Sequence, residues 1–95
     1  MAYYKIEWKA KAEKSFDKLS NPIKLQINKY LKKVVSSENP RAFGKALEKN
    51  LTGFWSYRVG KYRIIVDIQD DKLIVYIVAV GKQETIYEDV DKSLK

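Results

Sequence analysis

The sequence contains no cysteine and no histidine, and these two absences exclude several kinds of chemistry. Without cysteine the chain has no disulfide, no thiolate nucleophile and no cysteine-ligated zinc site. Without histidine it lacks the commonest general base and the commonest metal ligand of proteins. Any acid–base chemistry near neutral pH must therefore use tyrosine, lysine, aspartate or glutamate, and we expect neither a metal nor another cofactor.

Long apolar segments are also missing. The longest apolar run covers Leu73 to Val80, eight residues, which is far short of the roughly 20 that a membrane-spanning helix needs. The first residues alternate charged with aromatic side chains and contain no apolar region of the kind found in a signal peptide. We therefore expect a cytoplasmic protein.

The chain does carry an excess of positive charge. Its 19 lysine and arginine residues outnumber 12 acidic residues, which gives a formal net charge of +7. This excess favours an anionic partner, and charge alone leaves open whether that partner is nucleic acid, an acidic protein or a membrane surface. With 95 residues, 45% of them hydrophobic, the chain can bury one modest core, so we predict a single domain over residues 1–95.

The hydrophobic pattern predicts an opening strand followed by two helices. Residues 3–8 alternate apolar and charged side chains, as a half-buried strand does. Apolar positions at helical spacing then predict a short helix to Leu19 and, after Ser20-Asn21-Pro22, a second helix to about Ser37. So short a connection favours an antiparallel helical hairpin.

The second half of the chain predicts a loop and three strands. Residues 38–53 show no sustained period and are expected to form a loop with a short turn around 46–49. Strands are predicted at 54–59, 62–68 and 73–80, and their short connections imply antiparallel pairing. The order β-α-α-β-β-β predicts an α+β fold, in which a two-helix hairpin packs on one face of an antiparallel sheet. Residues 88–95 are expected to form a frayed helical tail.

The dipeptide Gly60-Lys61 predicts a two-residue hairpin with a type II′ turn. Such a turn pairs Val59 with Tyr62, and it pairs Arg58 with Arg63. Strand alternation directs one set of side chains toward the helices. The opposite face, called the second face below, then carries Phe54, Ser56, Arg58, Arg63, Ile65 and Asp67.

Two arginines directly opposite each other across a ladder repel by a few tenths of a kcal/mol to about 1 kcal/mol. A phosphate-binding site explains the pair, because the guanidinium group matches phosphate oxygens and keeps its charge at any physiological pH. Alternatively, each arginine extends into solvent or pairs with an acid such as Asp67. Geometry alone leaves both interpretations open.

The same region carries a family resemblance that extends over nearly the whole chain. Its features are a Gly-Lys-x-Leu loop, a Trp-x-x-Arg-Val-Gly-x-Tyr-Arg hairpin, and a strand ending in Val-Gly before a basic segment with tyrosine. They occur here as GKALEKNLTGFWSYRVGKYRIIVDI and VYIVAVGKQETIY. This pattern resembles the RelE/ParE toxin superfamily, and RelE-type toxins in particular.

The resemblance implies a toxin of a type II toxin–antitoxin system. RelE-type members inhibit translation as mRNA interferases: they cut messenger RNA on the ribosome without a metal, using cations and a tyrosine where other ribonucleases use histidine. The implied partners are the ribosome, mRNA and a cognate antitoxin, with no membrane and no metal. We expect exposed apolar side chains of Phe54 and Ile65 to contact that antitoxin.

The resemblance also assigns the site. Arg58 and Arg63 would stabilise negative charge on the phosphate in the transition state. Lys82 would act as general acid or phosphate contact. Tyr87 would act as base, if nearby cations favour a phenolate whose unperturbed pKa is about 10, or would stack on a nucleobase. Packing in the core explains this one tyrosine equally well. The expected RNA-binding residues are Lys45, Lys49, Lys61 and Gln83.

Three positions depart from the family pattern. Ser56 and Glu48 stand where basic residues are common, and Gln83 replaces an arginine. A neutral amide stabilises a transition state less than a guanidinium does. The alternatives are therefore a catalytically weakened toxin that mainly binds its antitoxin, or a ParE-like inhibitor of DNA gyrase. The other lysines are explained as solvated helix faces that together attract an anionic partner.

Overall fold

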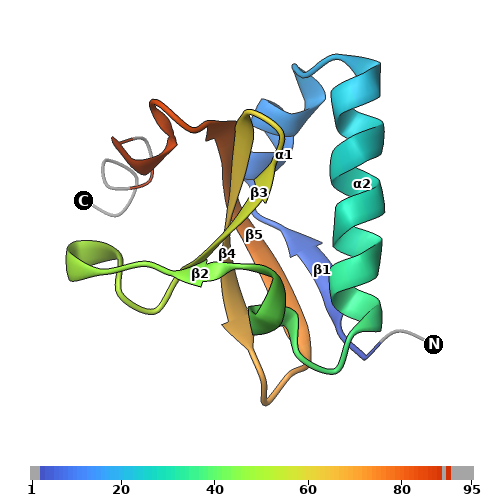
Figure 1. Cartoon of the computed structure of the whole chain (residues 1–95), viewed down its shortest axis with the longest axis vertical. Helices are drawn as coiled ribbons and strands as arrows, with labels where there is room; N and C mark the ends of the chain where they lie inside the picture. The colour runs from blue at the N-terminus through green and yellow to red at the C-terminus, as the bar shows by residue number, and fades with distance from the viewer. Residues whose placement is uncertain (1–2, 89, 91–95) are drawn as a thin grey trace.

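A computed structural model describes residues 3–88 and 90 of the chain. Figure 1 shows a sheet with the long helix α2 on one side and the C-terminal segment on the other. The elements in chain order are β1 (Lys5–Trp8), α1 (Ala10–Asp17), α2 (Asn21–Ser36), β2 (Lys45–Ala46), β3 (Trp55–Val59), β4 (Tyr62–Gln69) and β5 (Ile74–Lys82). The predicted helices and strands match these bounds to within two residues.

The sheet has five strands in the order β1-β5-β4-β3-β2. β3, β4 and β5 form the predicted antiparallel meander. β1 instead pairs in parallel with β5, which the predicted antiparallel sheet did not include. A parallel neighbour requires a long crossover, and the chain between β1 and β5 provides one. As a result β5 lies between β1 and β4, where its uninterrupted apolar sequence is covered.

The predicted loop over residues 38–53 contains more regular structure than its sequence indicates. Two 3-10 turns form at Pro40–Phe43 and Lys49–Leu51. Between them β2 pairs with the start of β3, with Lys45 opposite Ser56 and Ala46 opposite Trp55. A strand of two residues has no periodicity, so the hydrophobic pattern gave no signal for it.

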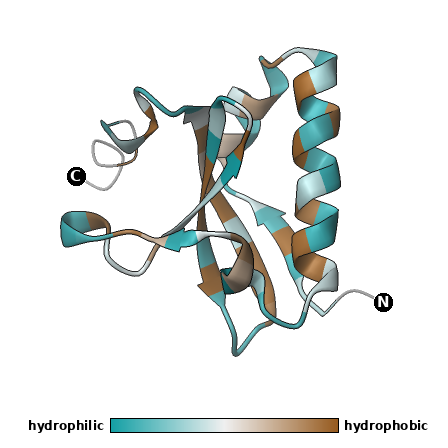
Figure 2. Cartoon of the chain, viewed as in Figure 1, coloured by the Kyte–Doolittle hydropathy of each residue, from teal (hydrophilic) through white to brown (hydrophobic). Residues whose placement is uncertain are grey.

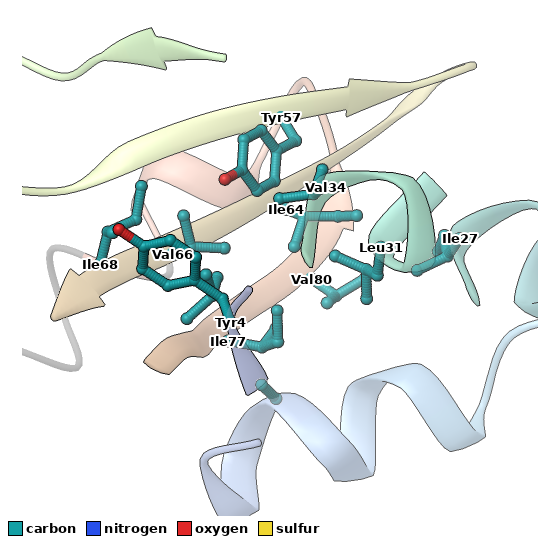
Figure 3. Packing of buried hydrophobic residues seen from close by; sticks show 12 residues of the cluster. Tyr4, Ile27, Leu31, Val34, Tyr57, Ile64, Val66, Ile68, Ile77 and Val80 are labelled. Carbon is teal, nitrogen blue, oxygen red and sulfur yellow. The ribbon is translucent and has the colours of Figure 1, made fainter. Parts of the chain in front are cut away.

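Both helices cover the same face of the sheet, as predicted. The apolar side of α2, formed by Ile27, Leu31 and Val34, is buried. Figure 2 shows hydrophobic and hydrophilic residues alternating along this helix. Ala12 of α1 joins the same core. The close view in Figure 3 shows this packing against the sheet. The buried strand residues of this core are Tyr57, Ile64, Val66, Ile68, Val75, Ile77 and Val80.

The second face has a smaller core, formed by Leu51, Ile65, Ile86 and Val90. Ile65 is fully buried, so the expectation that it is exposed for a partner is wrong, and Phe54 is half-buried against the same cluster. Residues 86–88 are helical; Ile86 belongs to this second core and Tyr87 packs against it. The rest of the predicted tail, residues 89 and 91–95, lies outside the described residues.

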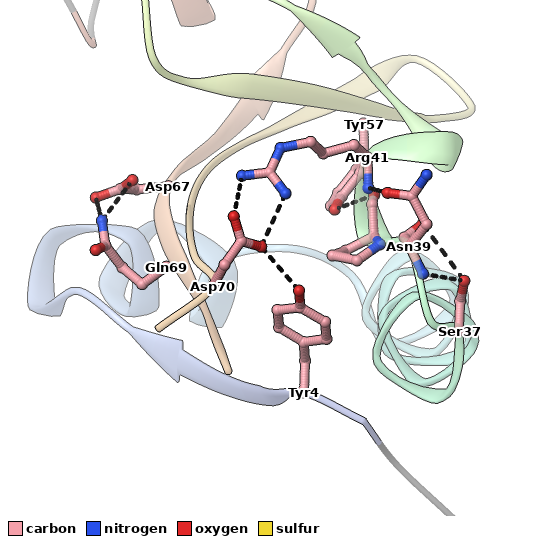
Figure 4. Close-up of polar contacts among 9 residues, drawn as sticks. Tyr4, Ser37, Asn39, Arg41, Tyr57, Asp67, Gln69 and Asp70 are labelled. Carbon is pink, nitrogen blue, oxygen red and sulfur yellow. Dashed lines mark hydrogen bonds and ion pairs between the residues drawn. The ribbon is translucent and has the colours of Figure 1, made fainter. Parts of the chain in front are cut away.

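The segment after α2 is fixed to the body by polar contacts, shown in Figure 4. Arg41 donates two hydrogen bonds of 2.9 Å to the Asp70 carboxylate, and the Tyr4 hydroxyl donates a third at 2.8 Å. These donors hold the pKa of Asp70 below its ordinary value. The Tyr57 hydroxyl donates to the Pro40 carbonyl at 2.7 Å in the interior. In the part of the chain that the structure describes, no helix is long and apolar enough to cross a membrane.

We predict that Tyr57→Phe lowers the free energy of unfolding by about 1–3 kcal/mol, because it leaves the buried Pro40 carbonyl without its donor. Burial raises the pKa of Tyr57 far above its ordinary value, so the hydroxyl stays protonated and donates at any working pH. Urea denaturation of both proteins measures the difference.

Tyr62→Phe is the matched control, since the half-buried Tyr62 hydroxyl has no hydrogen-bond partner within residues 3–88 and 90. Its stability should stay close to that of the wild type. Equal losses in the two variants would contradict a structural role for the bond from Tyr57 to Pro40.

Candidate functional site

The candidate site is built on the β3–β4 hairpin, whose register is the predicted one. Val59 lies opposite Tyr62, and Arg58 lies opposite Arg63. Gly60 has a φ of 59°, the left-handed value that the first turn position of a type II′ turn requires. Because directly opposite residues share a face, the two arginine side chains leave the strands on the same side of the sheet.

Within residues 3–88 and 90, no acid forms an ion pair with either arginine. The one ion pair among the described residues joins Arg41 to Asp70. Asp67, the acid suggested as a partner, accepts two hydrogen bonds of 2.9 Å from the Gln69 amide instead. The alternative in which an arginine of the hairpin forms an ion pair with Asp67 is therefore wrong. The arginines meet across the ladder with their charges uncompensated by a carboxylate.

The two guanidinium groups differ in environment. Arg63 is half-buried, and its Nε is buried without a hydrogen-bond partner in the described part of the chain. A buried polar atom without a partner costs free energy, and a ligand can reach this guanidinium only through its other nitrogens. Arg58 is exposed at the sheet edge, and its Nε has one long contact of 3.5 Å with the Gly60 carbonyl.

Tyr87 is fixed beside the same face by packing and by a hydrogen bond. Its ring is half-buried against the second core, and its hydroxyl lies 3.2 Å from Ser56 Oγ. The neighbouring Ile86 is 98% buried and approaches Gly81, where an added Cβ would lie 3.0 Å from Ile86 Cδ1. The small residue at 81 therefore lets the segment with Tyr87 lie close to β5.

Ser56 explains one of the departures from the family pattern. It is almost fully buried on β3, two residues before Arg58, and contacts Tyr87 directly. A longer basic side chain at this position would not fit the same contact. Sequence reasoning noted the missing charge at 56 and did not foresee the hydrogen bond, because the bond joins residues 31 positions apart.

A hollow of about 650 Å³ lies at the tip of the hairpin. The backbone N–H of Gln83 donates to the Lys61 carbonyl at 3.1 Å, which connects the tip to the end of β5. Lys82 pairs with Tyr62, so alternation directs it away from the side of Arg63, although its side chain reaches the hollow. The hollow is lined by Arg58, Gly60, Lys61, Lys82, Gln83 and Glu84.

The structure thus brings most of the predicted site residues into two groups. Arg58, Lys61, Lys82 and Gln83 surround the tip hollow. On the second face, exposed Lys45 pairs with Ser56 and so shares the side of the sheet that carries Arg63 and Tyr87. Arg58 of the first group lies opposite Arg63 of the second across the β3–β4 ladder, so the two groups are adjacent.

Lys49 belongs to neither group. It is exposed in the turn Lys49–Leu51, has a φ of 57°, and accepts hydrogen bonds from Thr52 through its carbonyl. Within the described residues its side chain contacts none of the other candidates.

Sequence reasoning missed a second hollow, of about 690 Å³, between α2 and the hairpin. Lys29 and Lys33 line it, and both had been explained as solvated residues of a helix face. Their spacing of four residues on one helix is the signal that was present. The two lysines line a hollow only because the hairpin lies beside α2.

Comparisons with known proteins agree with the fold. The family model of the ParE toxin of type II toxin-antitoxin system, parDE, matches residues 6–87. The mRNA interferase toxin RelE of Escherichia coli (strain K12) is 26% identical in an alignment of 98 positions, which covers 99% of this chain and 99% of that one.

Solved structures show the same likeness. The toxin–antitoxin complex RelBE2 of Mycobacterium tuberculosis contains a chain with a TM-score of 0.78 and 26% identity, over 87% of this chain and 94% of that one. The isolated RelE toxin of E. coli gives a TM-score of 0.70 and 24% identity, over 97% and 99% of the two chains. The second likeness shows the fold alone.

We predict that the arginine pair is a measurable repulsion. Arg58→Met or Arg63→Met should each raise the free energy of unfolding by a few tenths of a kcal/mol to about 1 kcal/mol, because methionine keeps the apolar stem and removes one charge. The double variant should gain little beyond either single one. Urea denaturation of the wild type, both single variants and the double variant, at low and high salt, measures these changes. High salt should reduce the gain in the free energy of unfolding.

Lys45→Met serves as control, because Ser56 and not a cation lies opposite Lys45. It should show no salt-dependent gain. A loss of more than about 1 kcal/mol in either arginine variant would mean that the side chain supports the fold, and the interpretation as a ligand site would lose its basis.

Proposed function

The chain belongs to the ParE toxin family of type II toxin–antitoxin systems, and on this premise we propose that it inhibits translation as a ribosome-dependent messenger endoribonuclease. The full-length similarity to the mRNA interferase toxin RelE supports this choice within the family. The observation that carries the proposal is the pair of arginines, side by side across the hairpin, with no acid bound to either.

The reaction requires stabilisation of a phosphate that gains negative charge. The 2′-oxygen of one nucleotide attacks the adjacent phosphorus, its bond to phosphorus forms, and the bond from phosphorus to the 5′-oxygen of the next nucleotide breaks. Arg63, half-buried on β4, supplies a positive charge that stabilises this phosphate. Arg58 adds a second positive charge from the neighbouring strand.

Two protons have to move in this reaction. In the proposed mechanism Tyr87, in its phenolate form, takes the proton of the attacking 2′-hydroxyl, and the Lys82 ammonium gives one to the departing 5′-oxygen. The Ser56 contact of 3.2 Å and the packing of Ile86 fix the place of the tyrosine. The tip hollow sets Lys82 beside Arg58. A chain without histidine has to rely on residues of these types.

The proposed RNA contacts surround these residues. Lys45 extends from β2 on the side of Ser56, and Lys61 and Gln83 line the tip hollow. Lys49 remains a proposed contact on its exposed turn. Gln83 can donate a hydrogen bond to a phosphate but brings no charge, so we expect slower cleavage than an arginine at this position would give.

Three observations favour the gyrase-inhibiting alternative. The tip hollow has a neutral glutamine at 83, and Ser56 provides no charge on the second face. The family model also carries the name of the ParE toxin. A binding protein of this kind would need no proton transfer, so the two functions differ in their dependence on Arg63 and Tyr87.

A cognate antitoxin is the proposed protein partner. The M. tuberculosis relative was solved as a toxin–antitoxin complex, and so was a RelE–RelB relative of Pyrococcus horikoshii. The net charge of +7 favours an acidic partner. Because the second face already has its own small core, we expect the antitoxin to add to that surface and not to cover an open apolar sheet.

We predict that the wild-type protein cuts messenger RNA on programmed ribosomes and that Arg63→Ala cuts it about 100-fold or more slowly, the usual loss for one transition-state donor. Primer extension on the messenger measures both rates. Lys5→Ala is the matched control, because Lys5 is an exposed cation on β1, with the two strands β5 and β4 between it and β3. Its rate should equal that of the wild type.

Intact messenger with the wild-type protein, together with inhibited supercoiling by DNA gyrase, would establish the alternative function instead. Intact messenger with unaffected gyrase would favour the remaining alternative, a catalytically weakened toxin that mainly binds its antitoxin.

We also predict that the protein co-purifies with the product of the short reading frame next to its gene, upstream or downstream. The expected partner is acidic, since it has to match a basic domain. Co-expression and affinity purification of either gene product tests this. If neither neighbour is retained, the proposal of a cognate antitoxin is wrong.

A further inference from the structure

The hollow between α2 and the hairpin is strongly basic. Its lining includes Lys29 and Lys33 from α2 and Arg58 from β3, and no acidic residue contributes to it. Neither lysine forms an ion pair with an acid in the part of the chain that the structure describes. Three cations around one hollow repel each other, and an anionic ligand would relieve that repulsion.

The sequence of α2 places these side chains on one stripe. Gln26, Lys29, Tyr30 and Lys33 follow the spacing i, i+3, i+4 and i+7, which puts them on one side of a helix. This stripe borders the buried side formed by Ile27, Leu31 and Val34. Packing of the apolar side therefore fixes the direction in which the lysines leave the helix.

Tyr30 forms a firm wall of the hollow. Its hydroxyl donates to the Phe43 carbonyl at 2.8 Å, and its ring lies 5.7 Å from the Tyr57 ring and 6.2 Å from the Phe43 ring. A side chain held on three sides is preorganised, whereas the two exposed lysines beside it are free to adjust to a ligand.

This hollow is continuous with the tip hollow. Arg58 and Gly60 line both of them, so Arg58 stands between Lys61 and Lys82 on one side and Lys29 and Lys33 on the other. β2 pairs only with Trp55 and Ser56, which leaves the end of β3 as a free edge of the sheet. The cations therefore follow a path around that edge.

We propose that the hollow between α2 and the hairpin binds backbone phosphates of the RNA strand next to the bond that is cut. This inference rests on the proposed function and extends it to a second binding site on the helix side of the sheet. A strand whose phosphate lies at Arg58 has its following phosphates within reach of Lys29 and Lys33. Phosphates carry no base information, so this site should fix the strand without selecting its sequence.

The test uses a single-stranded RNA oligonucleotide with 2′-O-methyl groups, which binds but offers no attacking hydroxyl. Its affinity is measured by fluorescence anisotropy over a series of salt concentrations. For Lys29→Gln/Lys33→Gln we expect about tenfold weaker binding, and the slope of log affinity against log salt should fall by about 1.4, since each lost phosphate contact of a single strand contributes about 0.7.

Lys14→Gln/Lys18→Gln is the matched control. It removes the same charge at the same spacing of four residues, from exposed positions on α1 and its C-terminal cap. This variant should bind with almost the wild-type slope. An equal loss in both double variants would show an effect of net charge only and would overturn the inference, as would wild-type binding by the α2 variant.

The binding assay separates this inference from the proposed function. If the wild-type protein cuts no messenger and the α2 variant alone loses RNA affinity, the nuclease proposal fails and the second site stands. If messenger is cut normally and the α2 variant binds the oligonucleotide like the wild type, the second site fails and the nuclease proposal stands.

Discussion

The site depends on one register, that of the β3–β4 ladder, which sets Arg58 opposite Arg63. A slip of either strand by one residue would turn its arginine to the helix side and bring its apolar side chains to the second face, so the two arginines would no longer share a face. Two features prevent it. Gly60 supplies the positive φ that the tight turn needs, and the fully buried Tyr57 and Ile64 fill the core only in this register.

The rest of the polar structure keeps the nearby acids away from these arginines. Asp70 is held by Arg41 and Tyr4 at the far end of the sheet, and Asp67 is bound to the Gln69 amide. The acids with identified partners on β4 and its following turn are thus engaged elsewhere, and the positive charge at the hairpin remains available. In this way the contacts that stabilise the fold also determine the electrostatics of the site.

The sequence predicted what depends on local chemistry. The hairpin pairs followed from a two-residue turn, and the helices followed from apolar positions at a period of 3.6. The parallel pairing of β1 with β5, the short β2 and the bond from Ser56 to Tyr87 were out of reach, because each joins distant segments. Lys29 and Lys33 had a visible spacing, but their hollow exists only because Arg58 lies beside α2.

The most direct test of the central claim observes the two guanidinium groups themselves. Nε–H signals of Arg58 and Arg63, assigned through the methionine variants, can be followed by NMR while the 2′-O-methyl RNA is added. The account predicts that both signals shift together and saturate at the same RNA concentration, because the two guanidinium groups lie opposite each other in one site. Two signals that stay in place while the RNA binds would contradict the account.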